Sequence, residues 1–89
     1  QTPSPEIALD IHYLLKAMDR LPEKQKEAIL LFEVSGFSIR EISELQESTE
    51  SATKTRLSRA RKELRRRMSE KRPASQLSET MASFVSILL

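Results

Sequence analysis

The sequence predicts an all-α fold, a small bundle of four helices with one further helix at the C-terminus. Apolar residues recur every three or four positions along most of the chain, which is the spacing of one face of a helix. No segment shows the strict alternation of a half-buried strand. Leu21-Pro22 and Gly36 separate the apolar pattern into pieces of helical length. With 89 residues, the chain can bury one modest core.

Two helices are expected in the first part of the chain, after a proline-containing linker at residues 1–5. Residues 6–20 have helix-spaced apolar side chains, and Pro22 cannot continue a hydrogen-bonded helix but fits the first position of the next one. That second helix should end near Ser35, because Gly36 is the only glycine and suits a left-handed C-terminal cap. The apolar stripe of the first helix consists of Ile7, Ile11, Leu14, Leu15, Met18 and Leu21.

A capping box marks the start of a short third helix. Ser38 and Glu41 have the S-x-x-E spacing in which each side chain binds the backbone of the other residue. Residues 46–49 break the helical pattern, and Ser48 or Thr49 can cap the helix that follows. The apolar edge of the short helix is formed by Ile39, Ile42 and Leu45.

The fourth helix, from Ser48 to Arg67, has one apolar and one basic face. A short helix, a turn of about four residues and a longer basic helix make a helix-turn-helix at the end of the bundle. Residues 1–53 have five basic and ten acidic side chains, whereas residues 54–72 have ten basic and two acidic ones. This asymmetry favours a polyanion, and double-stranded DNA in particular, as partner. The apolar stripe is Thr53, Leu57, Ala60, Leu64 and Met68.

Two sets of side chains are the candidate DNA-binding residues. The alternative is that this basic face is only solvated. One set is spaced i, i+3, i+4 and i+7 and is expected to face base edges: Ser51, Lys54, Thr55 and Ser58. The other set is expected to contact backbone phosphates: Arg40, Arg56, Arg59, Arg61, Lys62 and Arg65.

Residues 73–89 are expected to be an apolar helical extension of a domain at residues 6–72. Pro73 should end the basic helix, and residues 76–89 should form a fifth helix capped by Ser75 or Ser78. This helix could fold back on the core, pair with a second copy of the chain, dock a partner, or be a frayed end. Its stripe consists of Leu77, Met81, Phe84, Val85 and Leu88.

The composition argues against several classes of site. The chain has no cysteine and a single histidine, His12, so we expect no metal site and no cofactor. The serine and threonine residues lack the partners of a catalytic nucleophile, so we expect no enzyme activity. There is no apolar run long enough for a membrane span and no signal peptide, so no membrane contact is expected.

Two stretches, LPEKQKEAILLFEVSGFSIREISEL and KTRLSRARKEL, resemble region four of bacterial sigma factors of the extracytoplasmic-function class. The resemblance covers about residues 10–68 without a gap. Its motifs are Leu21-Pro22, Gly36 and the K-S-R-L-x-R-A-R pattern, which is matched at residues 54–61. The family often has Leu-Gly at the turn, where this chain has Gln46-Glu47. Glu47 must therefore avoid the left-handed conformation or be strained in it.

The resemblance implies a sequence-specific DNA-binding domain that recognises the minus-35 promoter element in transcription initiation. It also implies core RNA polymerase, through its flap region, and an anti-sigma factor as partners, in the bacterial cytoplasm. Nothing in the chain resembles region two, so we expect a piece of a longer sigma factor or a free-standing module. The alternative is a sigma-like interaction module that binds an anti-sigma factor rather than DNA. DNA affinity and its salt dependence separate the two.

Overall fold

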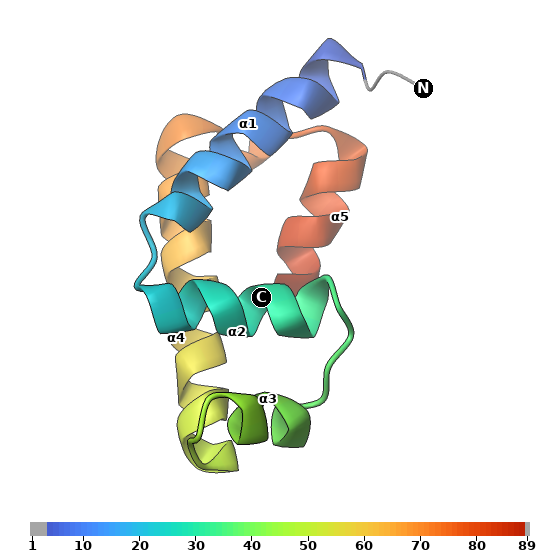
Figure 1. Cartoon of the computed structure of the whole chain (residues 1–89). Coiled ribbons are helices and arrows are strands. Elements are labelled where there is room, and N and C mark those ends of the chain that lie inside the picture. The colour runs from blue at the N-terminus through green and yellow to red at the C-terminus, as the bar shows by residue number, and fades with distance from the viewer. Residues whose placement is uncertain (1–3, 89) are drawn as a thin grey trace. The chain divides into compact units, whose positions relative to one another are not determined.

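The computed structural model describes residues 4–88, and these residues form five α-helices and no strand (Figure 1). The predicted all-α fold, with a fifth helix after the helix-turn-helix, is therefore confirmed. The contacts group the chain into two compact units: unit 2 is Leu21–Arg61, and unit 1 contains the residues before and after it. The helices are α1 (Pro5–Asp19), α2 (Glu23–Glu33), α3 (Ile39–Leu45), α4 (Glu50–Lys71) and α5 (Glu79–Leu88).

In unit 2, α2 begins one position later than the proline pattern predicted. Pro22 is the N-cap, with φ −54° and ψ 145°, instead of the first helical residue. Its carbonyl already accepts the first helical hydrogen bond, from the Lys26 N–H at 3.0 Å. A proline suits this position because it has no N–H that would need a partner. Ala28 and Ile29 then form the buried face of α2.

Gly36 ends the α2 region in the left-handed conformation, as predicted, with φ +73°. The N–H of the next residue, Phe37, donates to the carbonyl of Leu31 at 2.9 Å. This bond is the long one of a Schellman cap, in which a left-handed residue allows the chain to turn back on the helix end. A Cβ at Gly36 would meet no atom within 4 Å, so the backbone angle rather than space favours glycine here.

The predicted capping box opens α3. The Ser38 N–H donates to Glu41 Oε1 at 2.9 Å, and the Glu41 N–H donates to Ser38 Oγ at 3.1 Å. The bond from the Ser38 N–H also lowers the pKa of Glu41. Ile42 is fully buried, but Leu45 is 58% exposed, so the predicted apolar edge is wrong at its last residue. The turn buries Gln46 in its place.

The predicted apolar stripe of α4 is confirmed along its whole length. Its first residue, Thr53, is fully buried, and its hydroxyl donates to the Thr49 carbonyl at 2.9 Å, so no polar atom is left unpaired. Thr49 is also the cap of α4, because its hydroxyl accepts from the Ala52 N–H at 3.0 Å. The buried members of the stripe are Thr53, Leu57, Ala60, Leu64 and Met68.

In unit 1, α5 contacts α1, which is the fold-back arrangement among the alternatives for the C-terminal helix. The buried carboxylate of Asp10 accepts from Arg72 Nε at 2.7 Å and from the Ser78 N–H at 2.9 Å. Ser78 also caps α5, since its hydroxyl accepts from the Met81 N–H at 3.2 Å. The predicted stripe positions Phe84, Val85 and Leu88 lie outside the residues whose side chains are described.

The apolar stripe predicted for α1 is only partly buried. Met18 is buried, but Ile11 and Leu15 are 39% and 59% exposed. The buried face is centred on Asp10 and Ala17 instead, because Asp10 has partners from the C-terminal segment. Within the described part of the chain, no helix is long and apolar enough to cross a bilayer.

Candidate nucleic-acid interface

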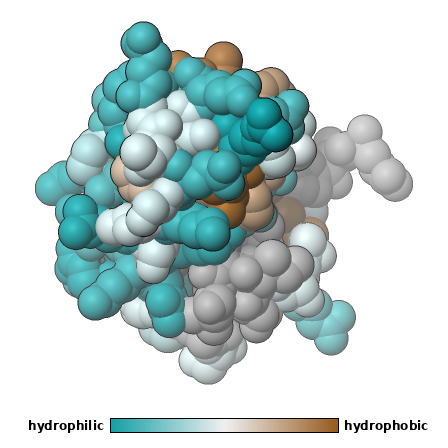
Figure 2. All heavy atoms as spheres, turned by 90° about the horizontal axis from the view of Figure 1, so that it is seen from below, coloured by the Kyte–Doolittle hydropathy of each residue, from teal (hydrophilic) through white to brown (hydrophobic). Residues whose placement is uncertain are grey.

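The candidate interface is formed by α3, the turn at residues 46–49 and the first turns of α4, all in unit 2 (Figure 1). In the space-filling view of Figure 2, most of the described side chains that can be seen are hydrophilic. The order of the elements is that of a helix-turn-helix, in which the second helix presents its first turns to the major groove. The exposed side chains on α4 therefore decide what this surface can bind.

The four predicted base-facing residues are all exposed on α4. Their helical spacing places them on the side opposite the buried Thr53, Leu57 and Ala60. Lys54 forms no ion pair with any described residue, so its ammonium is available to a ligand. The set thus combines one cation with three hydroxyl groups that can donate or accept hydrogen bonds: Lys54, Ser51, Thr55 and Ser58.

The predicted phosphate contacts fall into two groups. Arg40 is exposed, and its 3.3 Å pair with Glu44 is solvent-exposed on both sides and therefore weak. Three more cations are exposed without an ion pair among the described residues: Arg59, Lys62 and Arg65. Arg56 and Arg61, by contrast, are partly buried and engaged within the chain.

Arg61 is held by two contacts from α2. Its Nη2 lies 3.2 Å from Glu33 Oε1, and its guanidinium lies 5.2 Å from the centroid of the Phe32 ring. Such a combination of an ion pair and a cation–π contact fixes the direction of the side chain. Arg61 consequently also tethers α4 to α2.

The turn contains the one non-glycine residue with a positive φ among the described residues, Glu47, at φ 51°. Glu47 was expected either to avoid the left-handed conformation or to be strained in it, and the structure shows the second outcome. This conformation costs about 1–2 kcal/mol for a residue other than glycine. Its neighbour Gln46 is buried and hydrogen-bonded. The sequence patterns did not predict that the Gln46 side chain is buried. The only indication in the sequence was that a polar residue stands where region four of sigma factors often has leucine.

A comparison with models of known protein families identifies the family of this helix-turn-helix chain. The model described as "Sigma-70, region 4" matches residues 11–64, more than half of the chain. The chain belongs to the sigma-70 region 4 family. No curated protein and no solved structure gave a significant match.

Family membership gives this region 4 domain a general role. Region 4 of sigma factors is a DNA-binding regulatory domain that serves promoter recognition, and it is not a known enzyme family. The matched residues include all of α2 and α3, the turn, and α4 as far as Leu64. The described residues also contain no group of three or more His, Cys, Asp or Glu side chains that could hold a metal ion.

Two arginines in the part of α4 that belongs to unit 1 are paired with acids of the same helix. Arg66 contacts Glu63 at 2.6 Å and Glu70 at 2.7 Å, and Arg67 Nε lies 2.8 Å from Glu63. The hydrogen bond from Arg66 lowers the pKa of Glu63, and the same bond raises the pKa of Arg66. These arginines therefore contribute less free positive charge than their number in the sequence indicates.

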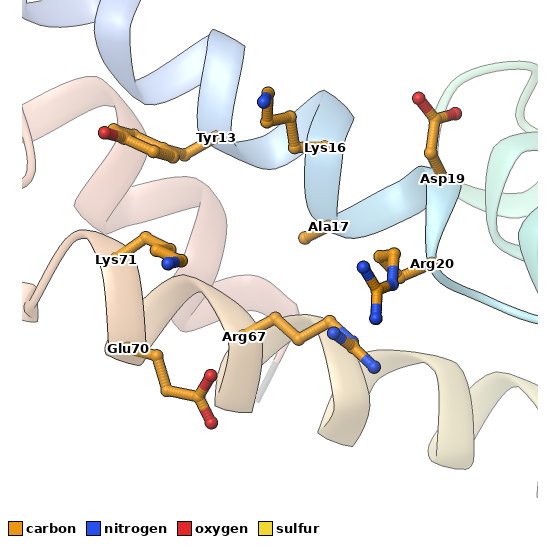
Figure 3. Close-up of a pocket in the computed structure, with 8 residues that line it drawn as sticks. All are labelled: Tyr13, Lys16, Ala17, Asp19, Arg20, Arg67, Glu70 and Lys71. Atoms are coloured by element: carbon orange, nitrogen blue, oxygen red, sulfur yellow. The ribbon is translucent and has the colours of Figure 1, made fainter.

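Unit 1 of the region 4 domain also has a basic cleft of about 540 Å³ between α1 and the end of α4. Figure 3 shows Arg20, the C-cap residue of α1, and Arg67 of α4 extending into the same side of this cleft. Two acids lie among its cations, so the net charge of the lining is modest. The lining consists of Tyr13, Lys16, Ala17, Asp19, Arg20, Arg67, Glu70 and Lys71.

Proposed function

We propose that this chain is the minus-35-reading domain of a sigma factor of the extracytoplasmic-function class. The observation that supports this function is the exposed Lys54 with its three hydroxyl neighbours, opposite a fully buried stripe on the same helix. A lysine can donate to guanine O6 and N7 in the major groove, and serine or threonine hydroxyls can pair with several base edges. Ser51, Lys54, Thr55 and Ser58 are the proposed base-reading residues.

Phosphate contacts position this helix on the duplex without reading sequence. Arg59, Lys62 and Arg65 are exposed and have no ion pair among the described residues, so they are the strongest candidates. Arg40 of α3 would contact the adjacent backbone, after exchanging its weak pair with Glu44 for a phosphate. Arg61 can contribute long-range charge while it remains bound to Glu33.

The proposed partners follow from the sigma-factor role. They are promoter DNA, the flap region of core RNA polymerase and an anti-sigma factor, and the proposed location is the bacterial cytoplasm, where the polymerase acts. The proposed domain is residues 6–72, with residues 73–89 as an extension. Contact between α5 and α1 favours a folded-back extension over self-association through residues 76–89.

The test is selection of the chain against a library of random duplexes, with and without the polymerase flap as a second ligand. One preferred motif, lost in Lys54→Ala but retained in the matched control Lys71→Ala, supports minus-35 reading. Binding with steep salt dependence and no preferred motif contradicts base reading. Failure to bind any duplex, together with tight binding of an anti-sigma factor, favours the sigma-like interaction module.

A further inference from the structure

We propose that Arg56 is a positioning residue, which holds the turn of the helix-turn-helix through Gln46 instead of contacting a DNA phosphate. This inference deepens the proposed function and revises the role that sequence spacing alone suggests for Arg56. It rests on a partly buried hydrogen-bonded cluster that we call the turn lock. Its members are Glu27, Gln46, Ser48, Arg56 and the Lys24 carbonyl.

The centre of the turn lock is the buried amide of Gln46, whose residue is only 8% exposed. Its Nε2 donates to the Lys24 carbonyl at 3.0 Å and to Glu27 Oε1 at 2.9 Å. Its Oε1 accepts from Arg56 Nη1. Both amide hydrogens and the amide oxygen thus have partners, as a buried amide requires.

The two charged partners fix the orientation of this amide. The amide nitrogen faces the carboxylate of Glu27, and the amide oxygen faces the guanidinium of Arg56. Reversing the amide would turn each end toward a charge of the wrong sign. Gln46 therefore connects α2 to α4 across the turn, with Arg56 as the contact on the α4 side.

Arg56 also contacts the turn through the side chain of Ser48. Its Nη1 lies 3.4 Å from Ser48 Oγ, and that hydroxyl lies 3.1 Å from the buried Thr53 hydroxyl. The strained residue Glu47 lies between Gln46 and Ser48, both of which Arg56 contacts. The cluster thus holds the residues on either side of the strained position.

This arrangement explains why Arg56 differs from Arg59, three residues further along α4. Arg59 is exposed and has no ion pair among the described residues, whereas Arg56 is partly buried with its Nη1 committed to the turn. A phosphate ligand affects the salt dependence of binding, because each contact releases counterions. Loss of a positioning residue instead destabilises the turn. It lowers the affinity for DNA by the same factor at every salt concentration, so the slope does not change.

The experiment compares Arg56→Ala with the matched control Arg59→Ala in the full chain, by thermal unfolding and by the slope of log affinity against log salt. For Arg56→Ala we expect Tm to fall by about 5 °C, the drop typical of one lost buried contact in a domain this small, with an unchanged slope. For Arg59→Ala we expect an unchanged Tm and a slope reduced by about 0.9. An unchanged Tm with a slope reduced by about 0.9 for Arg56→Ala would overturn the proposal.

Two further variants keep the test decisive if Arg56→Ala does not fold. Arg56→Lys retains the charge but not the planar fork, so a lowered Tm supports the turn lock, whereas an unchanged Tm contradicts it. Gln46→Leu removes the amide with little change in volume. In that background Arg56→Ala should cause a clearly smaller fall in Tm, because the partner is gone. An equal fall in both backgrounds would refute the coupling.

These stability measurements need no DNA, so they separate the two proposals. If the wild-type chain selects no duplex motif, the proposed function fails while the turn lock can still be tested by Tm alone. If a motif is selected but Arg56→Ala leaves Tm unchanged, the turn lock fails while minus-35 reading stands.

Discussion

Among the described residues, both halves of α4 contain unpaired and engaged cations, but the engaged ones have different partners: Arg56 and Arg61 bind groups outside α4, whereas those of the second half bind acids of α4 itself. In residues 50–61, Lys54 and Arg59 project from the surface without an ion pair among the described residues. In residues 62–71, Arg66 and Arg67 are bound to acids of the same helix. Cations that are already paired must give up that pair to bind a phosphate, so the count of charges alone does not define a binding surface.

The buried sides of the two halves are alike. The first half buries Leu57 and Ala60, and the second half buries Leu64 and Met68. Immediately after the second half, Arg72 forms an ion pair with the buried Asp10. The halves therefore differ mainly in the partners of their engaged arginines, and substitutions on the buried and exposed sides of α4 should have different effects.

The largest expected effect is on the buried side. Leu57→Ala should reduce the free energy of unfolding by about 2–5 kcal/mol, because it leaves a cavity under α4. A loss of that size is enough to unfold many domains of this length. Urea denaturation measures it, with the exposed Leu45→Ala as control. A stable, soluble Leu57→Ala protein would mean that the two faces of α4 are reversed.

The second-largest expected effect concerns the Asp10–Arg72 ion pair, which directly follows the end of α4. Asp10→Asn should cost about 3 kcal/mol, since it leaves Arg72 largely buried without a counter-charge. Burial alone would raise the pKa of Asp10, but the Ser78 N–H and the Arg72 guanidinium outweigh it and lower the pKa.

This lowered pKa gives the pair a defined pH dependence. Its contribution is complete above the pKa of Asp10 in the unfolded chain, and it is lost as the pH falls through the lower pKa of the folded state. Unfolding measured as a function of pH should therefore show a larger acid-side loss of stability in the wild type than in Asp10→Asn, where Glu41 and Glu63 still contribute. The exposed Glu6→Gln serves as control. An identical acid-side loss in both proteins would exclude Asp10 as its source.

A third effect compares the exposed faces directly. Lys54→Ala should weaken binding to the preferred duplex by about 1–3 kcal/mol and flatten the preference at one or two base pairs. Arg66→Ala, in the second half, should change neither affinity nor preference appreciably. Competition binding on matched and mismatched duplexes measures both. Equal losses for Lys54→Ala on every sequence would make Lys54 a phosphate ligand.

The smallest effect is on salt dependence. Arg59→Ala should lower the slope of log affinity against log salt by about 0.9, because one phosphate contact is removed. Arg66→Ala should leave the slope unchanged, since Arg66 remains paired with Glu63 and Glu70 in the free protein. If neither Arg59→Ala nor Arg61→Ala alters the slope, the first half of α4 is not the DNA face.

Local patterns predicted the helices and their ends well. The capping box at Ser38 and Glu41, the left-handed Gly36 and the stripe of α4 depend on residues close together in sequence. Their physical causes are hydrogen bonds across a few residues and the periodicity of a helix. Such features can be predicted without knowledge of the tertiary structure.

Long-range polar contacts could not be predicted in this way. Asp10 is not part of any apolar stripe of the sequence, yet it is buried, because its partners Arg72 and Ser78 come from the far end of the chain. Arg56 has the spacing of a phosphate ligand, but its guanidinium binds Gln46. In each case the decisive partner lies ten or more residues away, beyond the reach of local periodicity.

The Asp10–Arg72 ion pair joins two residues that both lie outside the segment matched by the family model. The matched segment is therefore shorter than the structure that this pair stabilises. The family match covers residues 11–64, so it excludes both members of the pair and ends inside α4. A protein trimmed to the matched residues would keep Lys54 and its neighbours but lose Met68, Arg72 and the contact between α1 and α5. Chimeras that transfer promoter recognition between sigma factors should therefore exchange this domain with its flanking residues rather than at the edges of the family match.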